Sequence, residues 1–322
     1  MTGDDHDAST GDDDASADGP LTTEETFALV GDEVRAEILR ALSDERGGEG
    51  ELPSLSFSEL RERVDVDVRS SQFNYHLQRL VGRFVENRAE GNAQLVEDVV
   101  PPDDDGYALR PEGTTLTRTI RARTGTGEGS LGPVAVDLDC YHCGTPVEAT
   151  YDNATFRLQC PDCEYLYEYD LVPPGVLDGE AETLSRVAEY VRHVRLAFAR
   201  GVCPLCGNSV DTSFDPPEET GYPRPDLREA CVNRSCDHCG HRNYLKVGEA
   251  LLRDPDLIAF CRERGLDVTT TPIWELEFAV TDRNVVVRST DPWEVALDLA
   301  LDGDTLELVV DEDLAVVERS SA

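Results

Sequence analysis

Four Cys-x-x-Cys pairs constrain the fold of this chain more than any other feature. Two thiolates two residues apart sit on one tight turn, and two such turns supply the closed four-sulfur shell of structural zinc. A glycine follows three of the pairs, at Gly144, Gly207 and Gly240, and allows that turn. The sequence therefore predicts two structural Zn²⁺ sites with these ligands: Cys140, Cys143, Cys160 and Cys163 for the first, Cys203, Cys206, Cys236 and Cys239 for the second.

The first site has the spacing of a zinc ribbon. Sixteen residues separate its two pairs, and Val147–Tyr151 and Thr155–Gln159 have the pattern of a hairpin, with Tyr165–Tyr169 as a third strand. The second site has a longer gap. Cys231 stands five residues before Cys236 and could replace a ligand there, so this ligand set stays open.

The ligand sets indicate metal sites that are structural and not catalytic. Four cysteines leave no open coordination position, which a catalytic zinc requires. We expect His142, His238 and His241 to lie beside the turns without binding the metal, and Cys261 to be a buried thiol on an apolar helix face. No Ser/His/Asp set and no phosphate loop appears, so we expect no enzyme.

The strongly acidic composition of the chain indicates a protein that works in a highly saline solvent. The chain has 66 acids against 29 bases, a net charge of −37, and Lys246 is its only lysine. The even distribution of acids along the chain and the avoidance of lysine resemble the composition of proteins from salt-accumulating haloarchaea. The alternative interpretation is an acidic partner-binding protein. Since molar salt screens charges within about 3 Å, the net charge does not exclude nucleic acid as a partner. No transmembrane run and no secretory signal is visible, so we expect a cytoplasmic protein.

Composition shifts and periodicity predict an α+β multidomain chain. We expect a helical domain followed by two zinc ribbons and a small antiparallel sheet with a helix. The expected boundaries are a disordered acidic tail at 1–20, a helical DNA-binding domain at 21–123, a linker at 124–133, ribbon 1 at 134–178, a connector helix at 179–201, ribbon 2 at 202–247 and an effector or interaction domain at 248–322.

The helical domain has clear start signals. Thr22 with Glu25 and Ser56 with Glu59 have capping-box spacing, and Asp32 can cap a helix over 33–43. A further helix is expected over 70–82, with Phe73, Leu77 and Leu80 on its apolar side and Ser71, Tyr75, Gln78 and Arg79 opposite. Two short helices around a tight turn, with a polar outer face on the second, are typical of a helix-turn-helix.

A hairpin follows that helix. Arg83–Glu86 and Tyr107–Arg110 are expected to pair as a wing, with Arg88 as its phosphate contact, and Pro111 begins a last helix. The segments GDEVRAEILRAL, FSELRERV, SSQFNYHLQRL and GYALRPEG resemble the winged-helix domain of ArsR-type regulators, in the form common among haloarchaeal regulators. The resemblance implies homodimers and a recognition helix at Arg69–Leu80, with these DNA-facing residues: Ser70, Ser71, Gln72, Asn74, Tyr75 and Arg79. Arg69 at the start of that helix and Gln78 on its polar side complete the set of expected DNA contacts.

The sequence pattern in the last part of the chain predicts a helix followed by strands. Gly248–Arg264 has helical spacing with a kink or restart at Asp254–Pro255. Ile273–Val280 and Val285–Arg288 alternate around a turn, and Asp302–Gly303 has the signal of a hairpin turn. An unknown effector or protein partner is expected to act on this part.

These features favour a transcriptional regulator that reads double-stranded DNA with a winged helix and uses zinc only for structure. The rival interpretation is a zinc-ribbon adaptor for RNA or the transcription machinery, in which the winged helix contacts protein. Binding to duplex DNA at high salt separates the two.

Overall fold

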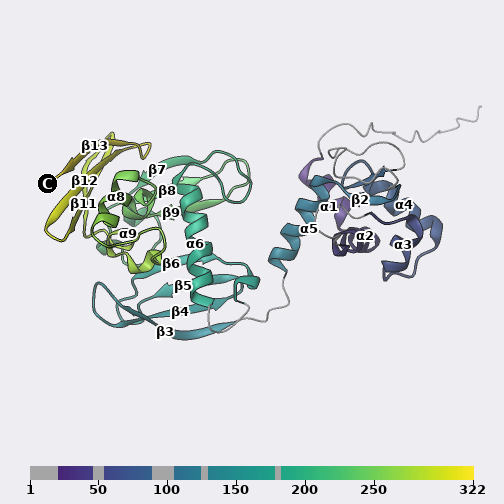
Figure 1. Ribbon diagram of the computed structural model, residues 1–322, viewed down its shortest axis with the longest axis horizontal. Helices are drawn as coiled ribbons and strands as arrows, with labels where there is room; N and C mark the ends of the chain where they lie inside the picture. Colours follow the sequence, from purple (N-terminus) through teal and green to yellow (C-terminus); the bar gives the residue numbers. More distant parts are fainter. Residues whose placement is uncertain (1–20, 46–53, 89–104, 125–129, 178–182) are drawn as a thin grey trace, which may run out of the picture. The chain divides into compact units, whose positions relative to one another are not determined.

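The computed structural model describes residues 21–45, 54–88, 105–124, 130–177 and 183–322 (Figure 1). The chain divides into two compact units, Met1–Ala122 and Arg123–Ala322. Helices and several antiparallel sheets make it a mixed α+β protein, as expected. None of the described helices combines the length and the apolar character that a membrane crossing requires. The predicted tail at 1–20 lies outside the described residues.

Helices dominate the first unit. They are α1 (Thr23–Val30), α2 (Glu33–Asp44), α3 (Phe57–Arg63), α4 (Ser70–Leu80) and α5 (Pro111–Arg123), with a hairpin of β1 (Val85–Asn87) and β2 (Tyr107–Leu109) between α4 and α5. Both predicted capping boxes are present, since Thr22 exchanges hydrogen bonds with Glu25 and Ser56 with Glu59. Asp32 caps α2 by accepting a hydrogen bond from the Arg35 N–H.

One apolar core holds these helices together. Ile38 of α2, Leu60 of α3, and Phe73 and Leu77 of α4 are completely buried. The ring of Phe57 packs edge-on against Phe73, with centroids 5.4 Å apart. The predicted apolar stripe of α4 is therefore its inner face, which leaves the opposite face of the helix to solvent.

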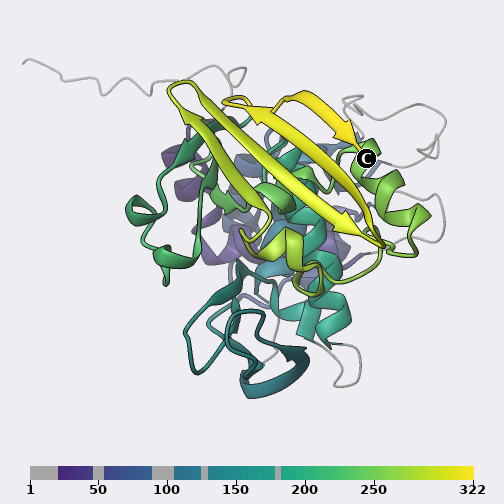
Figure 2. The same ribbon diagram turned by 90° about the vertical axis from the view of Figure 1, so that its left-hand side faces the viewer.

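The described part of the second unit, residues 130–177 and 183–322, forms three antiparallel sheets. The first is β3 (Leu131–Asp139), β4 (Pro146–Asp152), β5 (Thr155–Gln159) and β6 (Leu166–Leu171), and the second is β7 (Asp211–Asp215), β8 (Cys231–Ser235) and β9 (Arg242–Leu245). The third joins β10 (Val285–Thr290), β11 (Trp293–Leu301), β12 (Asp304–Asp311) and β13 (Val316–Ser321), which run side by side in Figure 2. The predicted turn at Asp302–Gly303 is confirmed, because Leu301 pairs with Asp304 across it.

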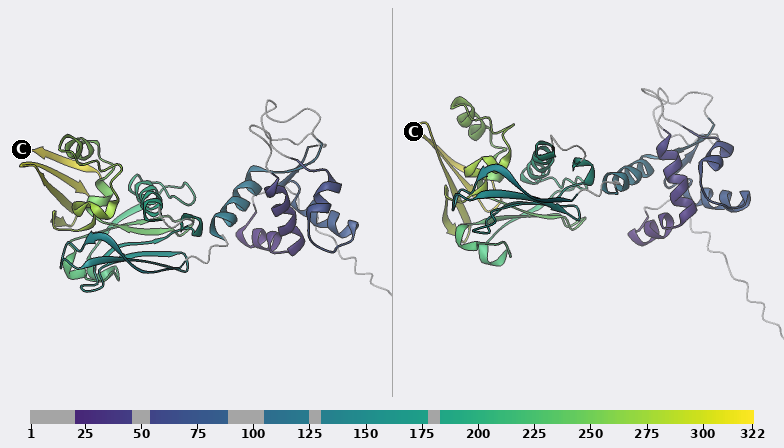
Figure 3. Two further views of the ribbon diagram at one scale, coloured as in Figure 1. Left: turned by 60° about the horizontal axis from the view of Figure 1, so that its bottom comes forward. Right: turned by 90° about the horizontal axis from the view of Figure 1, so that it is seen from below.

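Four helices connect these sheets. They are α6 (Thr183–Ala199), α7 (Val247–Leu251), α8 (Pro255–Glu263) and α9 (Glu277–Val280). The chain restarts at Asp254, whose carboxylate caps α8. A single core cluster runs from Cys140 to Leu314, and Figure 3 shows the three sheets and α6 in one body. The segments expected as separate ribbons, connector and terminal domain thus share one interior.

Two sequence predictions about this unit were wrong. Strand β3 begins at Leu131, inside the predicted linker 124–133, because Leu131 pairs with Tyr151 of β4. The predicted strand Ile273–Val280 is a short 3₁₀ turn followed by α9. Its apolar residues alternate only in part, and the segment is buried on several sides. Helix α9 packs so closely on α7 that a Cβ added at Gly248 would lie 1.9 Å from the Phe278 carbonyl oxygen.

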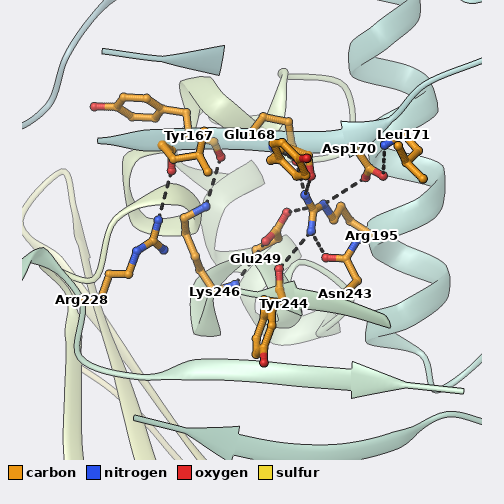
Figure 4. A network of polar contacts seen from close by, with 12 residues as sticks. Tyr167, Glu168, Asp170, Leu171, Arg195, Arg228, Asn243, Tyr244, Lys246 and Glu249 are labelled. Atoms are coloured by element: carbon orange, nitrogen blue, oxygen red, sulfur yellow. Dashed lines mark hydrogen bonds and ion pairs between the residues drawn. The ribbon is translucent and has the colours of Figure 1, made fainter. Parts of the chain in front are cut away.

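A buried guanidinium lies where the parts of this unit meet (Figure 4). Arg195 of α6 forms an ion pair with Glu168 of β6, and its Nε lies 3.7 Å from Asp170 of β6 and 3.4 Å from Glu249 of α7. It also donates to the Tyr244 carbonyl of β9 over 3.0 Å. One cation therefore joins both ribbon sheets, α6 and α7, and it neutralises only part of the charge of three carboxyls.

Loss of this cation should strongly destabilise the second unit. In Arg195→Leu the three buried carboxyls lose their counter-charge, so we expect the free energy of unfolding to fall by about 3–5 kcal/mol. Arg288 is a matched control because it also faces three carboxylates, Glu294, Glu307 and Glu318, but its side chain is 31% exposed against 5% for Arg195. Arg288→Leu should lower the free energy of unfolding far less, because solvent screens the charges of this exposed group. Equal losses in denaturant titrations of the two variants would contradict the role of Arg195.

The same network predicts a pH dependence. Burial raises the pKa of Asp170 to about 6, against the attraction of Arg195. The folded state therefore favours the protonated carboxyl, and the stability that this group contributes at low pH is lost as the pH rises through 6. Asp170→Asn cannot ionise, so from pH 5 to pH 7 its stability should improve relative to the parent protein by about 1 kcal/mol. A constant difference between the two proteins in denaturant titrations across this range would refute the assignment.

Candidate metal centres and nucleic-acid interface

The four Cys-x-x-Cys turns have the same backbone geometry. In each, the residue after the second cysteine donates its N–H to the carbonyl of the first cysteine, over 2.8–3.1 Å. The first cysteine donates in turn to a carbonyl five residues later, over 2.8–3.0 Å. Gly144, Gly207 and Gly240 have φ of 79°, 76° and 71°, as the sequence predicts, and Glu164 occupies the fourth equivalent position with φ 61°. The shared geometry aims both sulfurs of each turn to one side.

Two groups of four sulfurs result. The ligand atoms of Cys140, Cys143, Cys160 and Cys163 lie within 4.8 Å of one another, and so do those of Cys203, Cys206, Cys236 and Cys239. The closest pair between turns is Cys143–Cys160 at 3.4 Å in the first group, and in the second group Cys203–Cys239 and Cys206–Cys236 both lie at 3.6 Å. A tetrahedral ion with bonds of about 2.3 Å needs sulfurs about 3.8 Å apart. Both groups can thus hold a metal ion, as predicted.

Cys231 is outside the second group. It is the first residue of β8, it is 3% exposed, and burial raises the pKa of its thiol. The question that the sequence left open is therefore answered in favour of Cys236. Among the described residues the two groups contain no histidine, so His142, His238 and His241 are not part of them. Cys261 is completely buried on α8, as expected.

Local hydrogen bonds prepare one thiol of each group for a metal ion. Bonds from Thr145 lower the pKa of Cys143 to about 6, and the N–H of Asn208 lowers that of Cys206 to about 6. Burial instead raises the pKa of Cys160. A metal ion must displace the protons that the buried thiols keep, so folding and metal binding are coupled at both groups.

The surroundings of the two groups differ. At the first group, Tyr167 donates to the Cys140 sulfur over 3.2 Å, Tyr141 donates to the Glu275 carbonyl, and Arg224 donates to the Cys163 carbonyl. These contacts tie the first group to distant parts of the second unit. At the second group, Leu205 and Val202 are 55% and 44% exposed. The turns of the second group therefore present apolar side chains to solvent.

Most of the predicted DNA-facing residues lie on the outer side of α4. Phe73, Leu77 and Leu80 of this helix are buried, whereas the eight candidates from Arg69 to Arg79 are exposed: Arg69, Ser70, Ser71, Gln72, Asn74, Tyr75, Gln78 and Arg79. Tyr75 is 57% exposed although it is a large aromatic residue. His76, between the two faces, lies 3.1 Å from the Asp32 carboxylate and so joins α4 to the start of α2.

The ninth candidate was wrong. The Arg88 side chain is only 2% exposed, and its Nε lies 3.1 Å from the equally buried Glu86 carboxylate. Glu86 lies on β1, and Arg88 is the residue just after the end of that strand, two positions along the chain. That spacing was visible in the sequence and could have indicated an ion pair. The loop expected to carry the wing, 87–106, lies mostly outside the described residues.

Sulfur ligation can be tested by counting metal ions. Cys236→Ser removes a ligand of the second group, so bound metal should fall from two equivalents per chain to one. Cys231→Ser removes a nearby thiol that is outside the group and should leave two. Elemental analysis of the purified full chain gives both values. One equivalent in Cys231→Ser, or two in Cys236→Ser, would contradict the assignment.

Comparison with known proteins matches two family models to this chain. Residues 23–120 match a domain of unknown function, DUF7347, and residues 137–316 match a second one, DUF7351. The two matches follow the two units of the structure. No curated protein and no solved structure matches. The second match covers 180 of 322 residues, more than half, and the chain therefore belongs to the DUF7351 family.

Proposed function

We propose that the protein is a transcriptional regulator whose first unit is a winged helix-turn-helix that reads double-stranded DNA. The observation that carries the proposal is the outer face of α4. A helix that buries Phe73, Leu77 and Leu80 and exposes an unbroken row of hydroxyl, amide, tyrosine and guanidinium groups has the chemistry of a recognition helix.

Local charge supports this role. Asp67–Arg83 contains three arginines and one acid, although the chain as a whole has more than two acids for each base. Arg69 and Arg79 are exposed at opposite ends of α4, where phosphates on the two sides of a major groove would lie. Under molar salt a binder needs only this patch to be free of acids, because charges farther away are screened.

Two exposed apolar residues support dimerisation of the first unit. Phe27 on α1 is 70% exposed and Ile120 on α5 is 47% exposed. Large apolar side chains on two helices of one small unit favour a surface that a second copy covers. A homodimer would present two α4 helices to two half-sites on one duplex.

We further propose that both sulfur groups hold structural Zn²⁺ and that the protein is not an enzyme. Four thiolates in tetrahedral reach are the ligand set that zinc prefers in closed sites, and such a site has no position for a substrate. The metal would then fix the tips of the two ribbon sheets and leave binding to the outer surfaces.

The rival function is a zinc-ribbon adaptor for RNA or for a protein of the transcription machinery. One observation favours it: Val202 and Leu205 are exposed beside the second sulfur group. In that case α4 would contact another protein, and the chain would not bind duplex DNA.

Substitution on α4 tests the DNA-binding proposal. In gel shifts with fragmented genomic DNA at molar salt, we expect the parent protein to bind and the double variant Tyr75→Ala/Arg79→Ala to bind at least tenfold more weakly, since each base or phosphate contact contributes about 1–3 kcal/mol. The matched control is Tyr190→Ala/Arg200→Ala, which changes the same residue types on α6 and just after it. Equal retention of DNA by the parent protein and the α4 variant would contradict the proposal.

A further inference from the structure

The second unit contains a cleft whose lining differs from the rest of this acidic chain. Its volume is about 440 Å³, within the range of small-molecule sites. Its lining comes from β5, β6 and the loop between β7 and β8: Arg157, Gln159, Leu166, Tyr169, Thr220, Gly221, Tyr222 and Pro223. Among the described residues no acid lines it, although acids make up 66 of the 322 residues of the chain.

A small chamber of about 10 Å³, room for about one water molecule, lies directly behind the cleft. Leu166, Tyr169 and Tyr222 line both spaces and form the wall between them. The chamber is lined by three cationic side chains, Arg195, Arg228 and Lys246, and by the acid Glu168, while the carboxyls of Asp170 and Glu249 lie beside Arg195. Figure 4 shows these side chains close together.

Two of these cations donate hydrogen bonds to backbone carbonyls of β6. Lys246, the only lysine of the chain, donates to the Tyr167 carbonyl over 3.1 Å. Arg228 is 8% exposed, its guanidinium lies over the Tyr222 ring at 4.9 Å, and its Nε has no hydrogen-bond acceptor among the described residues. The buried carboxyl of Asp282 interacts electrostatically with Arg228, and burial raises the pKa of that carboxyl.

The walls of the cleft itself are aromatic. Tyr169 is 43% exposed, and the guanidinium of Arg157 lies 5.5 Å from its ring centre. Tyr222 is held from behind by an edge-on contact with Tyr244, with centroids 5.6 Å apart. Gln159 donates its amide N–H to the Glu164 carbonyl, which leaves its amide oxygen as an acceptor at the cleft.

The longer gap in the second Cys-x-x-Cys group has a structural counterpart here. The extra residues form the loop 216–230 between β7 and β8, and this loop supplies Thr220, Gly221, Tyr222 and Pro223 to the cleft. Gly221 and Arg224 have positive φ, 73° and 57°, so the loop follows a defined, bent path. A plain ribbon would not need these residues to hold its metal.

We propose that this cleft binds a small molecule that combines a flat ring with an anionic group, of the mononucleotide class. The ring stacks on the tyrosines of the wall, because every base has a face that stacks on an aromatic side chain. Arg157, which is exposed at the cleft, attracts the phosphate. The cleft at α8 and β12–β13, about 380 Å³, does not have this chemistry, because its lining pairs Asp256 and Glu263 with Arg264 and Arg319.

Titration calorimetry of the full, metal-loaded chain in molar KCl tests this site. The probes are AMP, GMP, CMP and UMP, each beside its nucleoside, with ribose 5-phosphate as the ring-free anion. We expect at least one mononucleotide to bind about tenfold or more tightly than both its nucleoside and ribose 5-phosphate, because the base contributes stacking and the phosphate contributes charge.

Variants assign the binding to this cleft. Tyr222→Ala and Arg157→Gln should each weaken that mononucleotide about tenfold, whereas Tyr222→Phe and the distant Arg319→Gln should leave it unchanged. Metal content and thermal unfolding show whether each variant is folded. Arg157 is exposed, so the Arg157→Gln variant tests the site without disturbing the packing of Tyr222.

Three results would overturn the proposal: no mononucleotide binds more tightly than its nucleoside, the folded Arg157→Gln variant binds as the parent protein does, or only single-stranded oligonucleotides bind. All residues invoked belong to the second unit, so such a result would leave the DNA-binding proposal for α4 untouched.

Discussion

The buried guanidinium of Arg195 is the interaction on which the second unit depends. It joins β6 of the first ribbon sheet, β9 of the second, helix α6 and helix α7 at one point, and it is almost completely shielded from water. In such surroundings a cation surrounded by three carboxyls tolerates little displacement, because each partner would otherwise be a buried charge without compensation. The two sulfur groups are therefore parts of one body, and one family model runs across both.

The first unit uses a different principle. Its core is apolar, and the polar side chains of α4 point outward and make few contacts inside the protein. In the second unit, by contrast, buried arginines donate hydrogen bonds within the protein. Arg192 donates to the carbonyl of Val268, and Arg234 donates to that of Ala199. This division of roles fits our proposal that the first unit provides the nucleic-acid surface while the metal-bound second unit provides a rigid body with a cleft of its own.

Short-range features of the fold were predictable from the sequence. The capping boxes at Thr22 and Ser56, the turns at the cysteine pairs and the hairpin at Asp302–Gly303 each depend on residues within five positions of one another, and all are present. The two-residue spacing of Glu86 and Arg88 would also have indicated their ion pair, which we missed.

Long-range features were not predictable. Arg195 is one polar residue in an otherwise apolar helical stripe, and nothing near it in the sequence indicates its partners, of which Asp170 is 25 residues away and Glu168 is 27. The segment Ile273–Val280 has partial alternation typical of a strand, but packing against α7 decides in favour of a helix. The ligand role of Cys236 rather than Cys231 likewise depends on strand β8, which places Cys231 in the interior.

The central claim is that the outer face of α4 reads duplex sequence, and selection from a random pool of DNA duplexes tests it most directly. The full, metal-loaded chain would be incubated at molar KCl with the pool, and the retained duplexes amplified and sequenced over several rounds. The account predicts enrichment of one sequence motif, repeated as two half-sites if the protein is a dimer. A pool that stays random while the protein remains folded would contradict it.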